Sequence, residues 1–200
     1  RQFFSRSFAN FSQSDDDRNR LIAAKAIPSL ILMANNTDNT PIERSHIALA
    51  MVRISTNVDG RNALIAAGAT PALVLMANNT DNTPETRSYI AFAMTNISET
   101  NIGTTALISA EAVPALVLMA KSDNTPSGRQ NIAFAMGNIS KTDDGRAALI
   151  DAEAIPSLVL MANSDNTPNG RANIALAMAN ISKTNIGTTA LISAEAVPAL

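Results

Sequence analysis

The sequence predicts an all-α solenoid in which short helices recur in groups of three. Two sets of prolines recur every 42 to 43 residues. The sequence motif around the first set is nearly constant, as in GATPALVLMA from Gly68 and EAVPALVLMA from Glu111. A fixed period of this length is typical of repeat proteins, in which each unit buries its apolar face against its neighbours. The two sets are Pro28, Pro71, Pro114, Pro156 and Pro198, and Pro41, Pro84, Pro126 and Pro168.

One complete unit spans residues 58–100. Its segment GRNALIAAG predicts a short amphipathic first helix. Pro71 begins a second helix, because proline is tolerated at the first helical position. The polar run 78–82 predicts a loop. Thr83-Pro84 then supplies an N-cap and a first-turn proline for the third and longest helix, which ends near Ser98.

The whole chain is expected to be a single array that begins and ends inside a unit, and hence a piece of a longer protein. The first residues match the last helix of a unit, because Phe4, Phe8 and Phe11 stand where a later unit has Ile90, Met94 and Ile97. The predicted division is 1–14 (partial), 15–57, 58–100, 101–142, 143–184 and 185–200 (partial).

The composition excludes several classes of function. The formal net charge is −2, so there is no basic excess to neutralise nucleic-acid phosphates. No apolar run approaches the roughly 20 residues of a membrane span. The chain has no cysteine and one histidine, His46, which excludes thiolate metal sites, a histidine-based catalytic triad and a multi-histidine metal site. We therefore expect a non-enzymatic protein with no cofactor, no metal, no small-molecule substrate, no nucleic acid and no direct membrane insertion.

The third helix of each unit carries a stripe with polar and apolar members. With 100° per residue, Phe92 and Tyr89 lie within about 40° of Asn96, whereas Met94 lies more than about 90° away and faces the stack. Asn96 is therefore expected on a face that the core does not use. The stripe comprises Asn10; His46, Leu49 and Arg53; Tyr89, Phe92 and Asn96; Asn131, Phe134 and Asn138; and Asn173, Leu176 and Asn180.

This asparagine ladder could hold an extended peptide. Packed helices lie about 8–10 Å apart and an extended chain rises about 3.3 Å per residue, so a ladder side chain would meet a bound strand every two to three residues. A carboxamide both donates and accepts, and so can bind a peptide backbone without reading its sequence. Two alternatives stay open: the asparagine ends a helix by bonding nearby backbone, and Arg53 either pairs with an acidic ligand or is a solvated residue at the edge.

The motifs of a unit follow in the order Gly-Arg, then ALI, then A-[IVT]-P-[AS]-L-[VI], then an alanine-rich helix that ends in Asn-Ile-Ser. In this order of motifs the unit resembles the armadillo repeat of importin-alpha, beta-catenin, vacuolar-protein-eight-like scaffolds and plant U-box ligases. The resemblance implies a right-handed superhelix with three helices per repeat. It also implies that Asn10, Asn96, Asn138 and Asn180 hold a peptide in the concave groove. Importin-like receptors differ in having tryptophan four residues before this asparagine and an acid four residues after it. This chain has no tryptophan, and the latter positions are Asn57, Thr100, Thr142 and Thr184.

The expected function is a protein- or peptide-binding scaffold located in the cytoplasm, the nucleus or both. One alternative is a nuclear import receptor, which the absence of those tryptophans and acids disfavours. The other is the substrate-recognition segment of a larger ubiquitin ligase.

Two further expectations concern structure. A second ladder, Arg44, Arg87, Arg129 and Arg171, lies in the first turns of the third helices, where the helix dipole disfavours a cation. Each arginine is expected to pair with the aspartate six residues before it, namely Asp38, Asp81, Asp123 or Asp165. Gly68 stands between a first and a second helix, and the other units have Lys25, Glu111, Glu153 and Glu195 there, so their bend is expected to be looser or made differently.

Overall fold

The computed structural model describes residues 2–194 and 196, with side chains from Ser5 onward. Within these residues the chain forms helices and no strand, which confirms the all-α prediction. Glu195, Pro198 and the side chain of Phe4 lie outside the described part. The helices are α1 (Gln2–Phe11), α2 (Asp15–Ala23), α3 (Ile27–Ala34), α4 (Pro41–Ile54), α5 (Val58–Ala66), α6 (Ala69–Ala77), α7 (Pro84–Ser98), α8 (Asn101–Ser109), α9 (Ala112–Ala120), α10 (Pro126–Ile139), α11 (Asp143–Asp151), α12 (Ala154–Ala162), α13 (Pro168–Ile181) and α14 (Asn185–Ser193).

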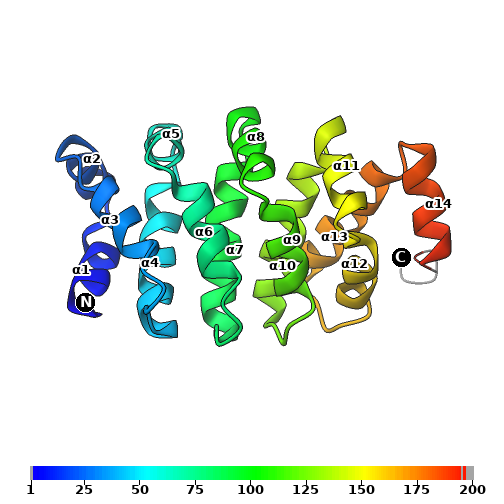
Figure 1. The fold of residues 1–200 in the computed structure, drawn as a ribbon, viewed down its shortest axis with the longest axis horizontal. Helices are drawn as coiled ribbons and strands as arrows, with labels where there is room; N and C mark the ends of the chain where they lie inside the picture. Colours follow the sequence, from blue (N-terminus) through cyan, green and yellow to red (C-terminus); the bar gives the residue numbers. More distant parts are fainter. Residues whose placement is uncertain (1, 195, 197–200) are drawn as a thin grey trace.

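The helices form a row of three-helix units along the long axis of the molecule, with α1 and α14 at opposite ends of the row (Figure 1). Each third helix packs against the third helices of the units beside it, in the order α1, α4, α7, α10, α13. The second helices α3, α6, α9 and α12 stack in the same way. The chain is therefore a solenoid with one continuous core.

The second and third helices together supply most of the core, and the third helices do so on the side that the helical period predicts. Ile90, Met94 and Ile97 of α7 are fully buried, as are Ala91 and Ala93. Alanine leaves room for the next helix to approach closely, and the branched and long side chains fill the space between units.

The third helices begin as predicted. The side-chain oxygen of Thr83 accepts a hydrogen bond from the backbone N–H three residues on, and Thr40, Thr125 and Thr167 do the same. The predicted start of the second helix at Pro71 is wrong by two residues, because α6 begins at Ala69 and Pro71 is its third residue. Proline is tolerated there because none of the first four N–H groups of a helix has a partner within the helix.

The bend between the first and second helices is made in one way throughout, contrary to the expected difference. Gly68 has φ 83°, and Lys25, Glu111 and Glu153 have φ 52°, 58° and 53°. All four residues adopt the left-handed conformation that favours glycine. Three of the units therefore carry a strained residue at the bend.

Glycine is required where the first helices α5, α8, α11 and α14 begin. A Cβ on Gly103 or Gly145 would overlap the carbonyl oxygen of Ile97 or Ile139, the end of the preceding third helix. Asp17 occupies this position in the first unit, and its helix α2 has no buried residue. Phe11 stands in the predicted register with Ile97, but it is 64% exposed where Ile97 is fully buried.

The arginine ladder joins neighbouring units, and its predicted partners are wrong. The Nε of Arg87 donates to Asn124 Oδ1 at 3.1 Å, and its two other nitrogens donate to the carbonyls of Asn82 and Asp123. The predicted partner was the earlier Asp81, but Asp81 pairs with an arginine of the preceding unit. The other interior members are Arg44, with Asn39, Asp81 and Asn82, and Arg129, with Asn124, Asp165 and Asn166.

Candidate functional site

The predicted stripe forms one accessible surface across four third helices. Phe92 is 39% and Leu176 38% exposed, while Leu49 and Phe134 are half-buried. Beside this apolar line the helices carry a partly exposed polar or aromatic residue one turn earlier. We define the third-helix face as His46, Leu49, Arg53, Tyr89, Phe92, Asn96, Asn131, Phe134, Asn138, Asn173, Leu176 and Asn180.

The ladder asparagines do not lie on the open part of this face, which corrects the prediction from the helical wheel. Asn96, Asn138 and Asn180 are 7%, 3% and 4% exposed. Their side chains point towards the preceding unit and are enclosed between neighbouring third helices. Asn10, at the end of the row, is exposed.

The ladder amides bind the preceding third helix through a serine. Asn138 Nδ2 donates to Ser98 Oγ at 3.0 Å, and Ser98 Oγ donates to the carbonyl of Thr95 at 2.6 Å. Asn180 donates to Ser140 in the same way at 3.1 Å. Each bond ties the last turn of one third helix to the next, and one N–H of each amide is used for it.

Arg53 follows the same rule. Its Nη1 donates to the carbonyl of Ala9 in α1. Asn96 makes the equivalent bond one unit later, where its Nδ2 donates to the carbonyl of Val52 at 3.2 Å. Asn96 also donates to Ser55 Oγ at 2.9 Å, so both its N–H groups are used. Arg53 therefore substitutes for an asparagine in a contact between units.

Two lysines at the end of the face were missed by the sequence reasoning. Lys141 Nζ donates to Asn138 Oδ1 and Lys183 Nζ to Asn180 Oδ1, each at 2.7 Å. Both lysines come three residues after the ladder asparagine, on the next helical turn. That spacing was the available signal in the sequence.

A hollow of about 280 Å³ opens between α4 and α7. Its lining includes His46, Leu49, Glu85 and Tyr89. The Nδ1 of His46 is buried and has no hydrogen-bond partner among the described residues. Burial raises the pKa of Tyr89, the carboxylate of Glu85 adds to this through its charge and a hydrogen bond, and Arg53 partly opposes it. Tyr89 therefore stays a neutral hydrogen-bonding group.

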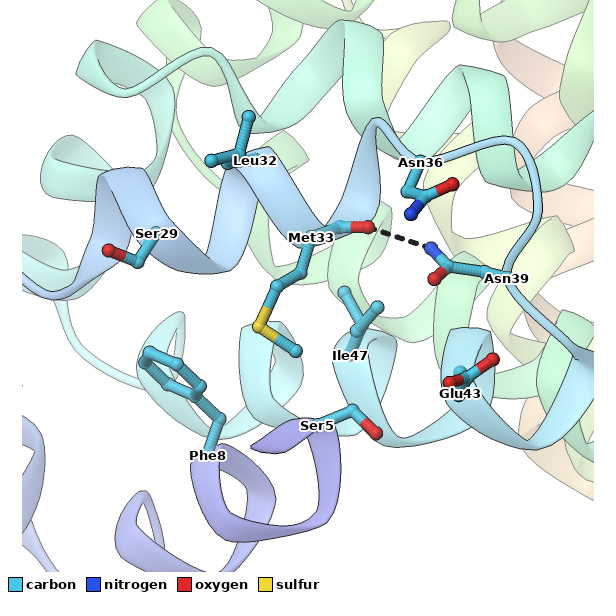
Figure 2. Close-up of a pocket in the computed structure, with 9 residues that line it drawn as sticks. All are labelled: Ser5, Phe8, Ser29, Leu32, Met33, Asn36, Asn39, Glu43 and Ile47. Atoms are coloured by element: carbon cyan, nitrogen blue, oxygen red, sulfur yellow. Dashed lines mark hydrogen bonds between the residues drawn. The ribbon is translucent and has the colours of Figure 1, made fainter. Parts of the chain in front are cut away.

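A second hollow, of about 380 Å³, lies at the start of the row between α1, α3 and α4 (Figure 2). Phe8, Leu32, Met33 and Ile47 give it an apolar lining, and Asn39 Nδ2 donates to the carbonyl of Met33 at 2.7 Å. Within the row the preceding second helix packs on the corresponding positions. Leu32 is 75% exposed, and its counterpart Leu75 only 37%. The hollow is thus an uncovered stacking surface.

The described residues contain no group of three or more histidines and acids that could hold a metal ion. No single described helix is long and apolar enough to cross a membrane. Two bent pairs meet that test only together, namely Val58–Ala66 with Ala69–Ala77, bent by 79°, and Asn101–Ser109 with Ala112–Ala120, bent by 82°.

No family model and no curated protein matches the chain, but solved structures do. A designed armadillo repeat protein is 26% identical and aligns over 99% of this chain and 83% of its own, with a TM-score of 0.81. Computationally designed armadillo repeat proteins for modular peptide recognition are 26% identical over 98% of this chain and 82% of their own, with a TM-score of 0.83. A third designed armadillo repeat protein, in complex with the peptide (KR)4, is 24% identical over 99% of this chain and 81% of its own, with a TM-score of 0.79.

Proposed function

We propose that this chain, whose fold is that of an armadillo-repeat solenoid, binds an extended peptide along the third-helix face. The observation that carries the proposal is the line formed by Leu49, Phe92, Phe134 and Leu176, which lies partly open on four consecutive helices. Apolar side chains left accessible in register offer the same kind of contact at each unit. A similar structure is a design for modular peptide recognition, which fits this use of the fold.

Binding would come mainly from the apolar line and its polar neighbours. Consecutive helices about 8–10 Å apart present one partly buried apolar group for every two to three residues of an extended chain. His46, Tyr89, Asn131 and Asn173 stand on one side of the line and can hydrogen-bond to a main chain.

The ladder asparagines contribute fewer hydrogen bonds to a bound peptide than their regular spacing suggests. Asn138 and Asn180 each keep one N–H beyond the bond to the preceding serine. We propose that this N–H donates to a peptide carbonyl. Asn96, whose N–H groups are both used, offers only its Oδ1. The asparagines thus connect the peptide to the contacts between units.

The test is a selection of random 12-residue peptides displayed on phage against the immobilised chain. Replacing Phe92 and Phe134 together by serine should abolish binding of most enriched peptides, because it removes the centre of the apolar line. Serine at Leu118 and Leu160, which are similarly exposed on second helices, should leave binding unchanged.

Two results would overturn the proposal. One is a selection that enriches no peptide above the level of an empty support. The other is a set of peptides that bind the Phe92→Ser/Phe134→Ser chain as tightly as the original, with the helical circular dichroism of both chains equal. Substitution of the ladder asparagines is a poor first test, because it also removes contacts between units.

A further inference from the structure

We infer that the part of the third-helix face on α10 and α13 selects peptides rich in acidic residues, through Lys141 and Lys183. This inference rests on the proposed function, because it specifies which peptide the face prefers. It concerns the last two third helices alone, where the two lysines occupy the same position of the repeat.

Both ammonium groups are held at the edge of the face. Each Nζ donates to the Oδ1 of the ladder asparagine one turn earlier, at 2.7 Å in both units. The asparagine is itself fixed by its bond to the preceding serine. Because α10 packs directly against α13, equivalent points on them lie about 8–10 Å apart, or two to three residues of an extended chain. Carboxylates at that spacing in a peptide could meet both lysines.

Among the described residues, neither lysine forms a salt bridge with the acids around it, which include Asp144 in the first turn of α11. Neither α10 nor α13 contains an acidic residue. Asp123 and Asp165 precede these helices and are about 20 Å away along the helix axes. Asp143 follows Lys141 but pairs with Arg146, in the first turn of α11. A bound acidic segment would supply the missing counter-charge.

Among the described units, lysine stands at this repeat position only in the last two. Arg53, the other cation of the third-helix face, lies on α4 and already donates to the carbonyl of Ala9. In the preceding unit the position equivalent to Lys141 is Glu99, and its carboxylate lies 3.1 Å from Arg61 of the first helix α5. In the unit before that the residue is Thr56. A peptide that covers the whole face should therefore carry its acidic residues where it crosses α10 and α13.

A lysine just past a helix also stabilises the helix by interacting with its C-terminal carbonyls, so the lysines could be purely structural. Lys121 separates the two roles. It is the C-cap of the second helix α9, one position nearer to its helix than Lys141 and Lys183 are to theirs, and it is not part of the third-helix face. Lys121→Glu is thus a matched control for charge reversal at Lys141 or Lys183.

The experiment uses the peptides selected on the original chain. Their content of aspartate and glutamate should exceed that of the unselected library, and the best peptide, labelled with fluorescein, should bind more weakly as salt rises. Lys141→Gln and Lys183→Gln should each weaken binding by about 2- to 5-fold, the range expected for one partly exposed ion pair. Lys121→Glu should leave the dissociation constant unchanged. The double variant Lys141→Glu/Lys183→Glu should instead enrich basic peptides.

Enriched peptides that are neutral or basic, or acidic peptides that bind both Gln variants as tightly as the original chain, would overturn the inference. Either result leaves peptide binding itself intact, provided that the Phe92→Ser/Phe134→Ser chain loses the same peptides. If that chain retains them, the proposed function fails, and the inference fails with it.

Discussion

Arg87 shows how single residues hold neighbouring units together. Its guanidinium is buried and lies against Asn124 and two backbone carbonyls from two different loops. Burial lowers the pKa of Arg87 and the charge of Asp123 partly restores it, yet an arginine remains protonated. The bonds to the loops explain why a cation is retained in the first turn of a helix. The sequence predicted that this arginine needs a partner, but it did not predict which one. In a solenoid, a residue about one repeat away in sequence lies as close as a residue in the same turn.

Arg87→Ala should lower the free energy of unfolding by about 2–4 kcal/mol, because it leaves buried carbonyl and amide oxygens without a donor. Arg171 is the matched control. It has the same place in its repeat and is exposed, and within the described part of the chain its guanidinium bonds only to the carbonyl of Asn166. Arg171→Ala should cost less than about 1 kcal/mol in urea unfolding monitored by circular dichroism. Equal losses would mean that the contacts between units contribute little.

The left-handed bend gives a second prediction at the scale of the residue. Glu153→Gly should raise the free energy of unfolding by about 0.5–1 kcal/mol, because glycine adopts φ 53° without the steric cost that glutamate has there. Glu153→Ala keeps the Cβ and the strain, and should bring no such gain. If alanine and glycine stabilise the chain equally, the charge of Glu153 and not the backbone is responsible.

At the scale of the helix, the sequence predicted most of what the structure contains. The threonine-proline pairs locate the third helices to the residue, because an N-cap and a first-turn proline both mark a helix start. The second helix at Pro71 was placed two residues late, since proline is compatible with any position of the first turn. The strained bend was not predicted, because lysine and glutamate give no sign of a positive φ.

Gly145→Ala should lower the free energy of unfolding by about 2–4 kcal/mol, because its Cβ would overlap the Ile139 carbonyl and push α11 away from α10. Gly137→Ala is the control within α10. A Cβ on Gly137 would lie 3.6 Å from its nearest neighbour, an ordinary contact. The higher helix propensity of alanine should then stabilise the chain by up to about 1 kcal/mol. Thermal unfolding of both variants by circular dichroism tests the difference. Two variants of equal stability would mean that α11 can shift freely.

Across the whole molecule, protection from solvent should vary with position in the row. The central third helices α7 and α10 have a partner on each side, whereas α2 has no buried residue and α14 lies at the end. Hydrogen–deuterium exchange followed by mass spectrometry should therefore show the slowest exchange in α7 and α10 and the fastest in α2 and α14. Uniform exchange rates along the chain would show instead that it opens as a single cooperative unit.

The third-helix face was predicted in outline from the sequence. The helical period placed Phe92, Phe134 and Leu176 on an accessible surface, where the structure has them. It also placed Asn96 there, and this failed because a helical wheel describes one helix and cannot show that the next unit covers part of the stripe. Use of this face for binding remains a prediction.

The contacts between units determine which insertions and deletions in the gene the fold can accommodate. Asn138 meets Ser98 as Asn180 meets Ser140, and Arg87 meets the next loop as Arg129 does, so each contact can be re-formed after a shift of one whole unit. Deleting residues 101–142 would join Thr100 to Asp143 and bring Asn180 to Ser98 and Arg87 to Asn166. Recombination between the gene segments that encode the identical strings 100–116 and 184–200 can therefore add or remove whole units. The units that become neighbours then form contacts of a kind that the structure already contains. A change of a few codons within a unit has no such protection.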